Sequence, residues 1–262
     1  MNGAVNLNIW QLVAAYVFVI ILILIVRMRG IAREKQILLS TVRMTVQLVL
    51  VGYLLVYLFD NINPFFTIGV VIIMEVFAVY NIFKRTKYRL SKRLKRAVAI
   101  SMTIGTLSCL FYFLLVVLRV NPWYNPRYFI PIAGMIIGNS MTGVSVGVNQ
   151  LVDGMQTKKH LVESALMLGA SPKIAAKDIV NSAFDSAILP TINSMLGMGI
   201  VFLPGMMTGQ ILSGTSPLTA IEYQIAIMLS ILGSVALTVV IFVQLGYKSF
   251  FNSEDQLVIE DN

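Results

Sequence analysis

The stretch AAYVFVIILILIV (residues 14–26) decides the fold class. A transmembrane β-strand would alternate between polar and apolar residues over about 10 positions, whereas this run is apolar throughout. A helix needs about 20 apolar residues to cross roughly 30 Å of hydrocarbon, and the run lies within a longer apolar segment, residues 9–26. The sequence therefore predicts helices that span a membrane.

The composition of the whole chain agrees with that prediction. Of the 262 residues, 57% are hydrophobic and 12% are charged, whereas soluble domains carry about 25% charged residues. We predict an all-α integral membrane protein with one permease domain (1–248) and a short, acidic, mobile cytoplasmic tail (249–262). The seven predicted spans are 9–26, 37–59, 65–83, 97–118, 128–148, 187–204 and 218–245.

The basic residues orient these spans. Lys and Arg are retained in cytoplasmic connections, and they gather in the first, third and fifth connections, with eight of them at 84–96. The connections DNINP (60–64) and SGTSP (213–217) carry none; Arg119 and Arg127 in the fourth are the exception. We predict a plasma-membrane protein with its N-terminus outside and its C-terminus in the cytoplasm. The basic block is typical of a topology anchor on anionic lipid, so we expect no nucleic-acid partner.

The motifs of common enzymes are absent from the sequence. It contains no G-x-x-x-x-G-K-[ST] phosphate loop, no H-E-x-x-H and no cysteine cluster. Cys109 is the only cysteine and lies in an apolar run; His160 is the only histidine, in a basic segment, and is predicted to lie at the surface. We expect no enzyme and no cofactor bound by this chain, so uphill transport would draw on an ion gradient or another subunit.

The fifth connection, 149–186, is long and helix-compatible. In the segment from His160 onward, Leu161, Ala165 and Leu168 fall on one side of a helix. Gly169 can end that helix in the left-handed conformation.

Ser171 and Pro172 then form an N-cap and first-turn pair that predicts a second helix. One face of this helix is polar (Asp178, Asn181, Ser182, Asp185) and the other is apolar (Ile179, Val180, Ala183, Phe184, Ala187). Because it runs into the sixth predicted span, it could carry a push on the turn into the membrane. An amphipathic connector lying passively on the membrane would have the same pattern.

The pattern Glu163-x-Ala165-(three residues)-Gly169, followed by Leu-Pro, resembles the EAA loop of ABC-transporter permeases. Pro190 lies 21 residues after Gly169, later than in that pattern, which separates the chain from standard importer permeases. The resemblance implies docking of an ATPase subunit on this turn. The implied coupling residues are Glu163, Ala165, Leu168, Gly169, Ala170, Ser171 and Pro172.

The segment LPGMMTGQILSG (203–214), together with ALMLGASP, resembles the FetB-type permeases of bacterial iron-export ABC transporters. These permeases are related to plant proteins linked to aluminium tolerance, and the resemblance covers essentially the whole chain. It implies a dimeric permease subunit that pairs with a separate ATPase carrying ATP and Mg, and that exports a metal ion, iron by analogy. The transported species and the direction of transport rest on this resemblance alone.

Charged groups inside spans are costly and therefore mark candidate transport sites. Glu75 lies in the third span, and Arg43 and Gln47 share a face of the second. At about 1.5 Å per residue, Glu75 and Arg43 reach a similar depth, which favours an ion pair. The alternative is a lone carboxylate that binds a hard cation.

Further candidates lie in the later spans. GMIIG (134–138) and GVSVG (143–147) predict close helix packing, although a span so rich in Gly and polar groups could also line a path. The sixth span carries several Met residues, which are typical of packing, and a break at Pro204-Gly205. Glu222 also suits the first turn of the last helix. The remaining tentative pathway residues are Asn139, Asn193, Met206, Met207, Gln210 and Glu222.

Two other readings use the same residues. A self-sufficient secondary cation transporter or channel, coupled to protons through Glu75, would need no ATPase, and residues 149–186 would be a passive connector. A seven-helix receptor is supported by the helix count alone.

Overall fold

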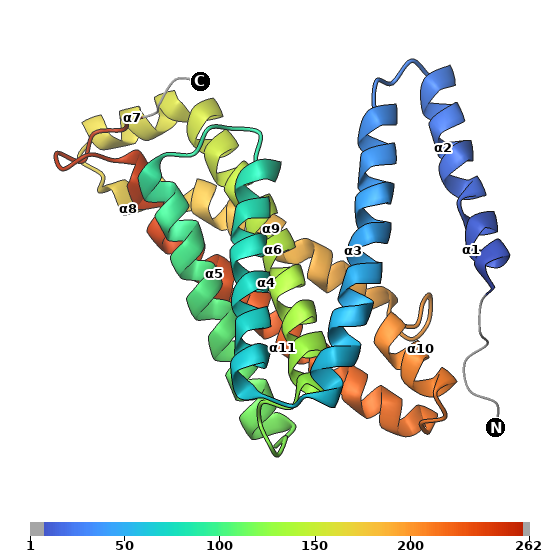
Figure 1. Ribbon diagram of the computed structural model, residues 1–262. Coiled ribbons are helices and arrows are strands. Elements are labelled where there is room, and N and C mark those ends of the chain that lie inside the picture. Colours follow the sequence, from blue (N-terminus) through green and yellow to red (C-terminus); the bar gives the residue numbers. More distant parts are fainter. Residues whose placement is uncertain (1–7, 259–262) are drawn as a thin grey trace.

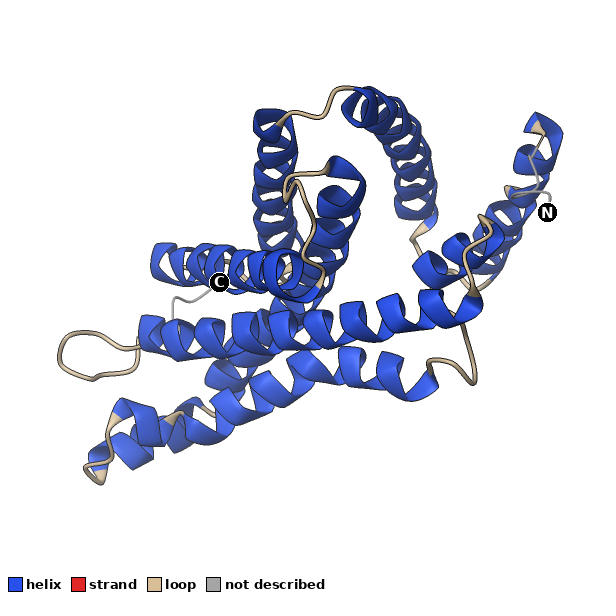
Figure 2. Cartoon of the chain, turned by 90° about the horizontal axis from the view of Figure 1, so that it is seen from below, coloured by secondary structure: helices blue, strands red, loops and turns tan. Residues whose placement is uncertain are grey.

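The computed structural model describes residues 8–258. Over this range the chain forms helices, turns and two isolated bridges, Met198 with Phe202 and Phe251 with Leu257, and no strand (Figure 2). The all-α prediction is therefore confirmed. Six helices are long and apolar enough to cross a membrane: Ile9–Met28, Glu34–Asp60, Pro64–Arg85, Lys92–Val117, Pro126–Thr157 and Pro217–Phe250.

The helices follow the chain order shown in Figure 1. They are α1 (Ile9–Ala15), α2 (Val17–Met28), α3 (Glu34–Asp60), α4 (Pro64–Arg85), α5 (Lys92–Tyr112), η1 (Phe113–Val117), α6 (Pro126–Thr157), α7 (Lys159–Met167), α8 (Pro172–Ala175), α9 (Lys177–Gly197), α10 (Gly205–Leu212), α11 (Pro217–Gly246) and η2 (Tyr247–Phe250).

The helix boundaries differ from the predicted spans around the fifth connection. Helix α6 runs on to Thr157, past the predicted span end at 148, because no proline interrupts residues 149–157. The predicted sixth span, 187–204, begins within α9, whose helix ends at Gly197. Residues 198–204 are non-helical, which confirms the expected break before Gly205. Because its first half is polar, α9 is not among the six candidate spans.

Helices α4, α5, α6, α9 and α11 form the core of the molecule. Small residues let them approach closely. A Cβ at Gly105 on α5 would lie 2.7 Å from the Cα of Thr238 on α11. Ser140 on α6 and Ser234 on α11 share a buried hydrogen bond of 2.9 Å.

Helices α1 to α3 form a hairpin that stands apart from this core (Figure 1). Neither α1 nor α2 has a buried side chain, and α3 has one, Leu58. Within the hairpin, the hydroxyls of Tyr16 and Thr45 are 2.6 Å apart. The hairpin therefore presents apolar faces to lipid or to a partner helix.

The basic connections lie at one end of the molecule. In Figure 1 the α2–α3 turn, the α4–α5 connection and α7 are at the upper end, and the α3–α4 and α5–α6 connections are at the lower end. The Tyr88 hydroxyl donates a 2.9 Å hydrogen bond to Asp153, which ties the α4–α5 connection to α6. This bond raises the pKa of the Tyr88 phenol above its ordinary value.

The acidic tail begins with aromatic residues that pack on the hydrophobic core, a contact that the composition of the tail did not predict. Phe250 and Phe251 are 7% and 6% exposed and belong to the hydrophobic core. After Phe251 the chain turns back, and Val258 N–H donates a 2.7 Å hydrogen bond to the Phe250 carbonyl. The burial of these two aromatic side chains is not evident from the acidic composition of the tail.

Candidate functional site

Glu75, in the middle of α4, is the only charged side chain among the described residues that are buried, with 7% of its surface exposed. The Thr106 hydroxyl on α5 lies 3.1 Å from Glu75 Oε2 and 2.7 Å from the Met102 carbonyl oxygen. A hydroxyl has one hydrogen to donate, so it cannot fully satisfy both acceptors. Glu75 Oε1 has no hydrogen-bond partner. Because an unpartnered buried carboxylate is costly, this site is suited to binding a cation or a proton.

Arg43 does not pair with Glu75, so the ion-pair interpretation was wrong for this structure. The guanidinium carbon lies 5.3 Å from the centre of the Phe77 ring in a cation–π contact. Phe77 follows Glu75 by two positions, which on a helix turns it by about 200° to the other side. Similar depth in the membrane is therefore not enough to bring Arg43 and Glu75 together, because depth does not fix the direction in which a side chain faces. Arg43 and its neighbour Gln47 are both exposed on α3.

The glycines of α6 serve helix packing. A Cβ at Gly143 would lie 2.8 Å from Val235 on α11, and a Cβ at Gly147 would lie 3.4 Å from Ala187 on α9. The predicted packing role is what the structure shows at these two positions. Asn139 is exposed and donates a 2.7 Å hydrogen bond to the Met135 carbonyl of its own helix, so it does not join the Glu75 site.

A second polar group lies where α9, α10 and α11 meet. Gln224 on α11 is 7% exposed, and its Nε2 lies 3.8 Å from the sulfur of Met198. The side-chain oxygens of Gln224 and Gln210 are both buried without a partner. Met207 is buried and Met206 half-buried in the same region.

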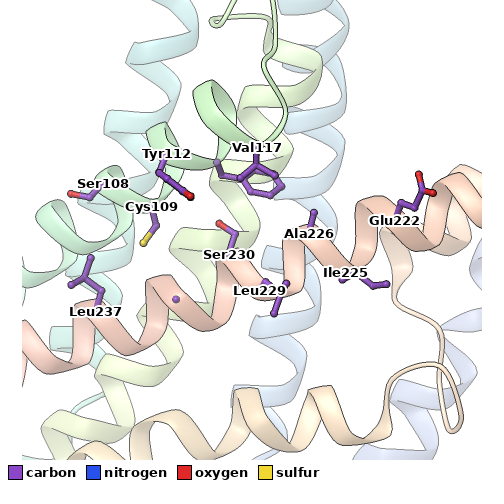
Figure 3. A pocket seen from close by; sticks show the side chains of 12 residues that line it. Ser108, Cys109, Tyr112, Val117, Glu222, Ile225, Ala226, Leu229, Ser230 and Leu237 are labelled. Atoms are coloured by element: carbon purple, nitrogen blue, oxygen red, sulfur yellow. The ribbon is translucent and has the colours of Figure 1, made fainter.

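The other two pathway candidates are exposed. Asn193 lies on the exposed side of α9. The sequence suggested that Glu222 lies in the first turn of the last helix. It is the sixth residue of α11 and therefore lies in the second turn. It borders a groove of about 860 Å³ between α5 and α11. Figure 3 shows Cys109 from α5 and Ser230 from α11 in this groove. Its walls are mainly apolar, which suits an acyl chain or a helix better than a metal ion.

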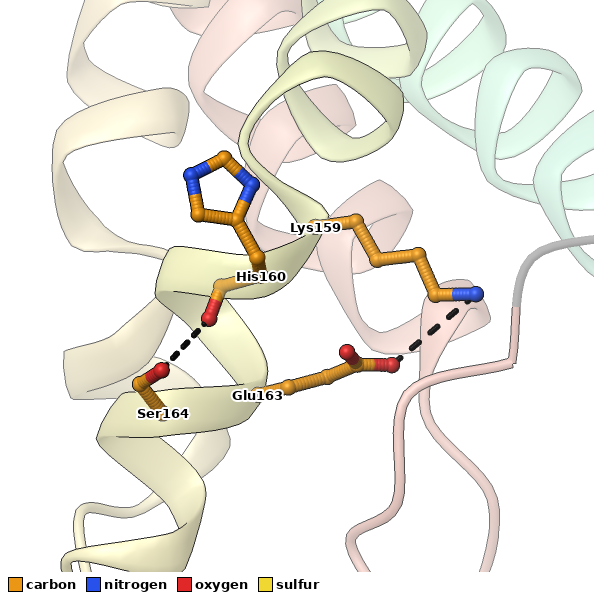
Figure 4. A network of polar contacts seen from close by, with 4 residues as sticks. All are labelled: Lys159, His160, Glu163 and Ser164. Carbon is orange, nitrogen blue, oxygen red and sulfur yellow. Dashed lines mark hydrogen bonds and ion pairs between the residues drawn. The ribbon is translucent and has the colours of Figure 1, made fainter.

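The coupling element begins with α7 and a tight turn. Gly169 has φ +86°, and its N–H bonds the Leu166 carbonyl at 2.9 Å, while Ala170 N–H bonds the Ala165 carbonyl at 3.0 Å. This pair of bonds is the Schellman motif, so the predicted left-handed cap is confirmed. Figure 4 shows the ion pair of 3.9 Å between Lys159 and Glu163 on α7. His160 is exposed, as predicted.

The turn presents large apolar side chains at one end of the molecule, outside the six candidate spans. Met167 and Leu168 are 86% and 89% exposed, while Val162 is the buried residue of α7. The predicted apolar side that includes Leu161 therefore faces away from the core. Exposed apolar side chains that lie next to each other outside the candidate spans can form part of a contact surface for another protein.

Beyond the turn, Pro172 occupies the first position of α8 as predicted, and Ser171 is the N-cap, although its side chain makes no cap hydrogen bond. The helix breaks at Ala176 and continues as α9. The face with Ile179, Ala183 and Ala187 is buried, as the pattern predicts. It packs against α6, where a Cβ at Gly154 would lie 2.6 Å from Ile179 Cγ2. The turn is therefore linked to the core through α9.

Sequence reasoning missed Thr106 and Gln224. Both are polar residues inside predicted spans, which is the signal that singled out Glu75. Among residues 8–258, no group of three or more His, Cys, Asp or Glu side chains could hold a metal ion.

Comparison with known proteins connects this architecture to a family. The profile of the family described as "Uncharacterised protein family (UPF0014)" matches residues 9–251. The chain is 35% identical over 255 residues to the "Probable iron export permease protein FetB" of Escherichia coli, covering 97% of this chain and 96% of that protein.

Two further relatives are similar over most of their length. The "UPF0014 membrane protein YjkA" of Bacillus subtilis is 36% identical over 243 residues, covering 92% of this chain and 94% of that protein. The "Protein ALUMINUM SENSITIVE 3" of Arabidopsis thaliana is 35% identical over 244 residues, covering 93% and 88%. No solved structure matches the chain.

Proposed function

Because the chain belongs to the UPF0014 family of multi-pass membrane proteins, we propose that it is the permease subunit of an ABC transporter that exports a metal ion, with iron as the cargo. A relative named as a probable iron export permease supports the cargo. The relative named for aluminium sensitivity makes other metal ions the natural competitors to test.

The observation that carries the proposal is the exposed turn at Gly169 joined to the core by α9. Met167 and Leu168 offer apolar surface to an ATPase subunit. A displacement of the turn would pass along α8 and α9 to α6, because Gly154 and Ile179 leave no slack between α6 and α9. In this mechanism ATP and Mg belong to the ATPase, and this chain supplies the moving helices.

The membrane topology follows from the same assignment. We assign the turn to the cytoplasm, together with the basic connections at that end of the molecule, which places the N-terminus outside. The C-terminal half of α9, from about residue 187, would be a seventh, incomplete crossing that ends in the non-helical stretch before Gly205. The exposed hairpin α1–α3 offers surface for lipid and for the second copy in a homodimer.

Within the membrane, Glu75 is the proposed cargo contact. Its free Oε1 and the Thr106 hydroxyl are hard oxygen ligands, which suit iron better than the methionine sulfurs near Gln224. The Met198 and Gln224 pair would then lie on the release side.

The unpartnered Glu75 oxygen also favours a second candidate, a proton-coupled cation transporter that works without an ATPase. Reconstitution separates the two. The chain is placed in liposomes with and without its ABC ATPase, and iron movement is followed with ATP or with a pH gradient. We expect iron movement only with ATPase and ATP. Movement driven by the pH gradient in the absence of ATPase would contradict the proposal and support the second candidate.

A further inference from the structure

The C-terminal segment 251–258, called the hook below, lies beside α7, the first helix of the coupling element. The hook is held by its own polar bonds: the Asn252 side-chain oxygen accepts 2.9 Å hydrogen bonds from the N–H groups of Glu254 and Gln256. It is anchored by the bridge between Phe251 and Leu257. Figure 4 shows Glu163 and Lys159 extending from α7 toward the pale-red ribbon of this segment.

Between α7 and the hook is a hollow of about 450 Å³. Its apolar part comes from Leu166 and Met167 on α7 and from Leu257 on the hook. Glu163, Glu254 and Asp255 add carboxylates at its edge. Two segments separated by some 90 residues of sequence thus build one concavity beside the Gly169 turn.

The charge of the hollow contrasts with that of its surroundings. This end of the molecule is otherwise basic, with eight Lys and Arg at 84–96 and further lysines at 158, 159, 173 and 177. The only ion pair described for the three carboxylates is the one between Glu163 and Lys159, 3.9 Å long and half-exposed. Such pairs contribute little and exchange readily. The hollow is therefore complementary to an apolar side chain flanked by Lys or Arg.

We propose that the hook forms the second wall of the ATPase docking socket, opposite the α7 turn, and receives a basic, apolar-tipped segment of the ABC ATPase subunit. This inference rests on the proposed function and adds to it: docking would need the C-terminal segment as well as the turn. Met167, exposed at 86%, becomes covered when the socket is filled. The carboxylates steer the partner and fix its register.

The test uses the full chain in detergent and a separately purified ATPase, namely the protein that co-purifies with wild type and carries a G-x-x-x-x-G-K-[ST] loop. Kd is measured at several salt concentrations for wild type, for the double variant Glu254→Lys/Asp255→Lys and for Asp60→Lys. Asp60 ends α3 at the opposite end of the molecule, so its reversal, a change of +2 beside +4 for the double variant, controls for a charge reversal away from the hollow. Asn252→Ala loosens the hook without changing charge.

We expect the double variant to raise Kd roughly tenfold and to reduce the salt dependence of binding, while Asp60→Lys leaves both unchanged. Asn252→Ala should weaken binding with the salt dependence retained. Equal or tighter binding by the double variant would contradict the role of the hook in docking the ATPase. The proposed ATPase-coupled function would not be affected by that result. If no ABC ATPase co-purifies with wild type, the proposed function fails, and the socket fails with it.

Discussion

Gly154 on α6 faces Ile179 on α9 so closely that a Cβ at Gly154 would lie 2.6 Å from Ile179 Cγ2. The nearby atom belongs to a β-branched side chain, which has little rotamer freedom. A displacement of α9 toward α6 is therefore passed on to α6. The proposed coupling of the Gly169 turn to the membrane helices requires this contact.

Gly154→Ala tests this contact. The added methyl group should push α9 away from α6 and cost about 1–3 kcal/mol of stability. We expect ATPase binding to remain and ATP-driven transport to fall, as measured in liposomes. Gly138→Ala on the same helix is the control, because a Cβ there meets nothing within 4 Å. Equal transport by both variants would show that α6 does not receive the motion.

Gly105→Ala tests the packing of α5 on α11. A Cβ at 105 would lie 2.7 Å from the Thr238 Cα, which is backbone and cannot rotate away. We expect a loss of about 1–3 kcal/mol, visible as a lower midpoint of thermal unfolding in detergent. Gly69→Ala on α4, where a Cβ meets open space, should be neutral or stabilising. The packing account fails if the two variants unfold at the same temperature.

Glu75→Gln removes the carboxylate charge and keeps an oxygen that can accept from Thr106. If Glu75 contacts the cargo, transport should fall to background while the fold and ATPase binding persist. Thr106→Val removes the hydroxyl and leaves the carboxylate, so we expect a smaller loss, roughly tenfold. Iron uptake into inverted vesicles measures both. Retained transport in Glu75→Gln would assign Glu75 a structural role.

Arg43→Gln separates the cation–π contact from the expected ion pair. Losing an exposed contact with Phe77 should cost less than about 1 kcal/mol. Breaking a buried ion pair would cost about 3–5 kcal/mol, because Glu75 would be left charged and alone. The unfolding midpoints of wild type and variant in detergent distinguish these two values. A large drop in the midpoint would support the ion pair between Arg43 and Glu75.

The coupling element could be predicted from the sequence because its signals are local. Gly169 permits a left-handed conformation, Pro172 suits a first turn, and the faces of α9 follow from periodicity. The partner of Arg43 could not be predicted, because depth along a helix does not give its rotation. The hook was missed for a similar reason. Its position depends on Phe250 and Phe251 packing on the hydrophobic core, which an acidic tail composition does not reveal.

Co-purification of the ABC ATPase with Gly169→Trp, beside wild type and Gly30→Trp, tests the central claim most directly. Both glycines have positive φ and open space around them, so the two variants share the backbone strain. They lie in the α2–α3 and α7–α8 connections, which Figure 1 shows at the same end of the molecule. We predict stoichiometric ATPase with wild type and Gly30→Trp, and none with Gly169→Trp. Equal recovery with all three chains, or no ATPase with any of them, would contradict docking on the Gly169 turn.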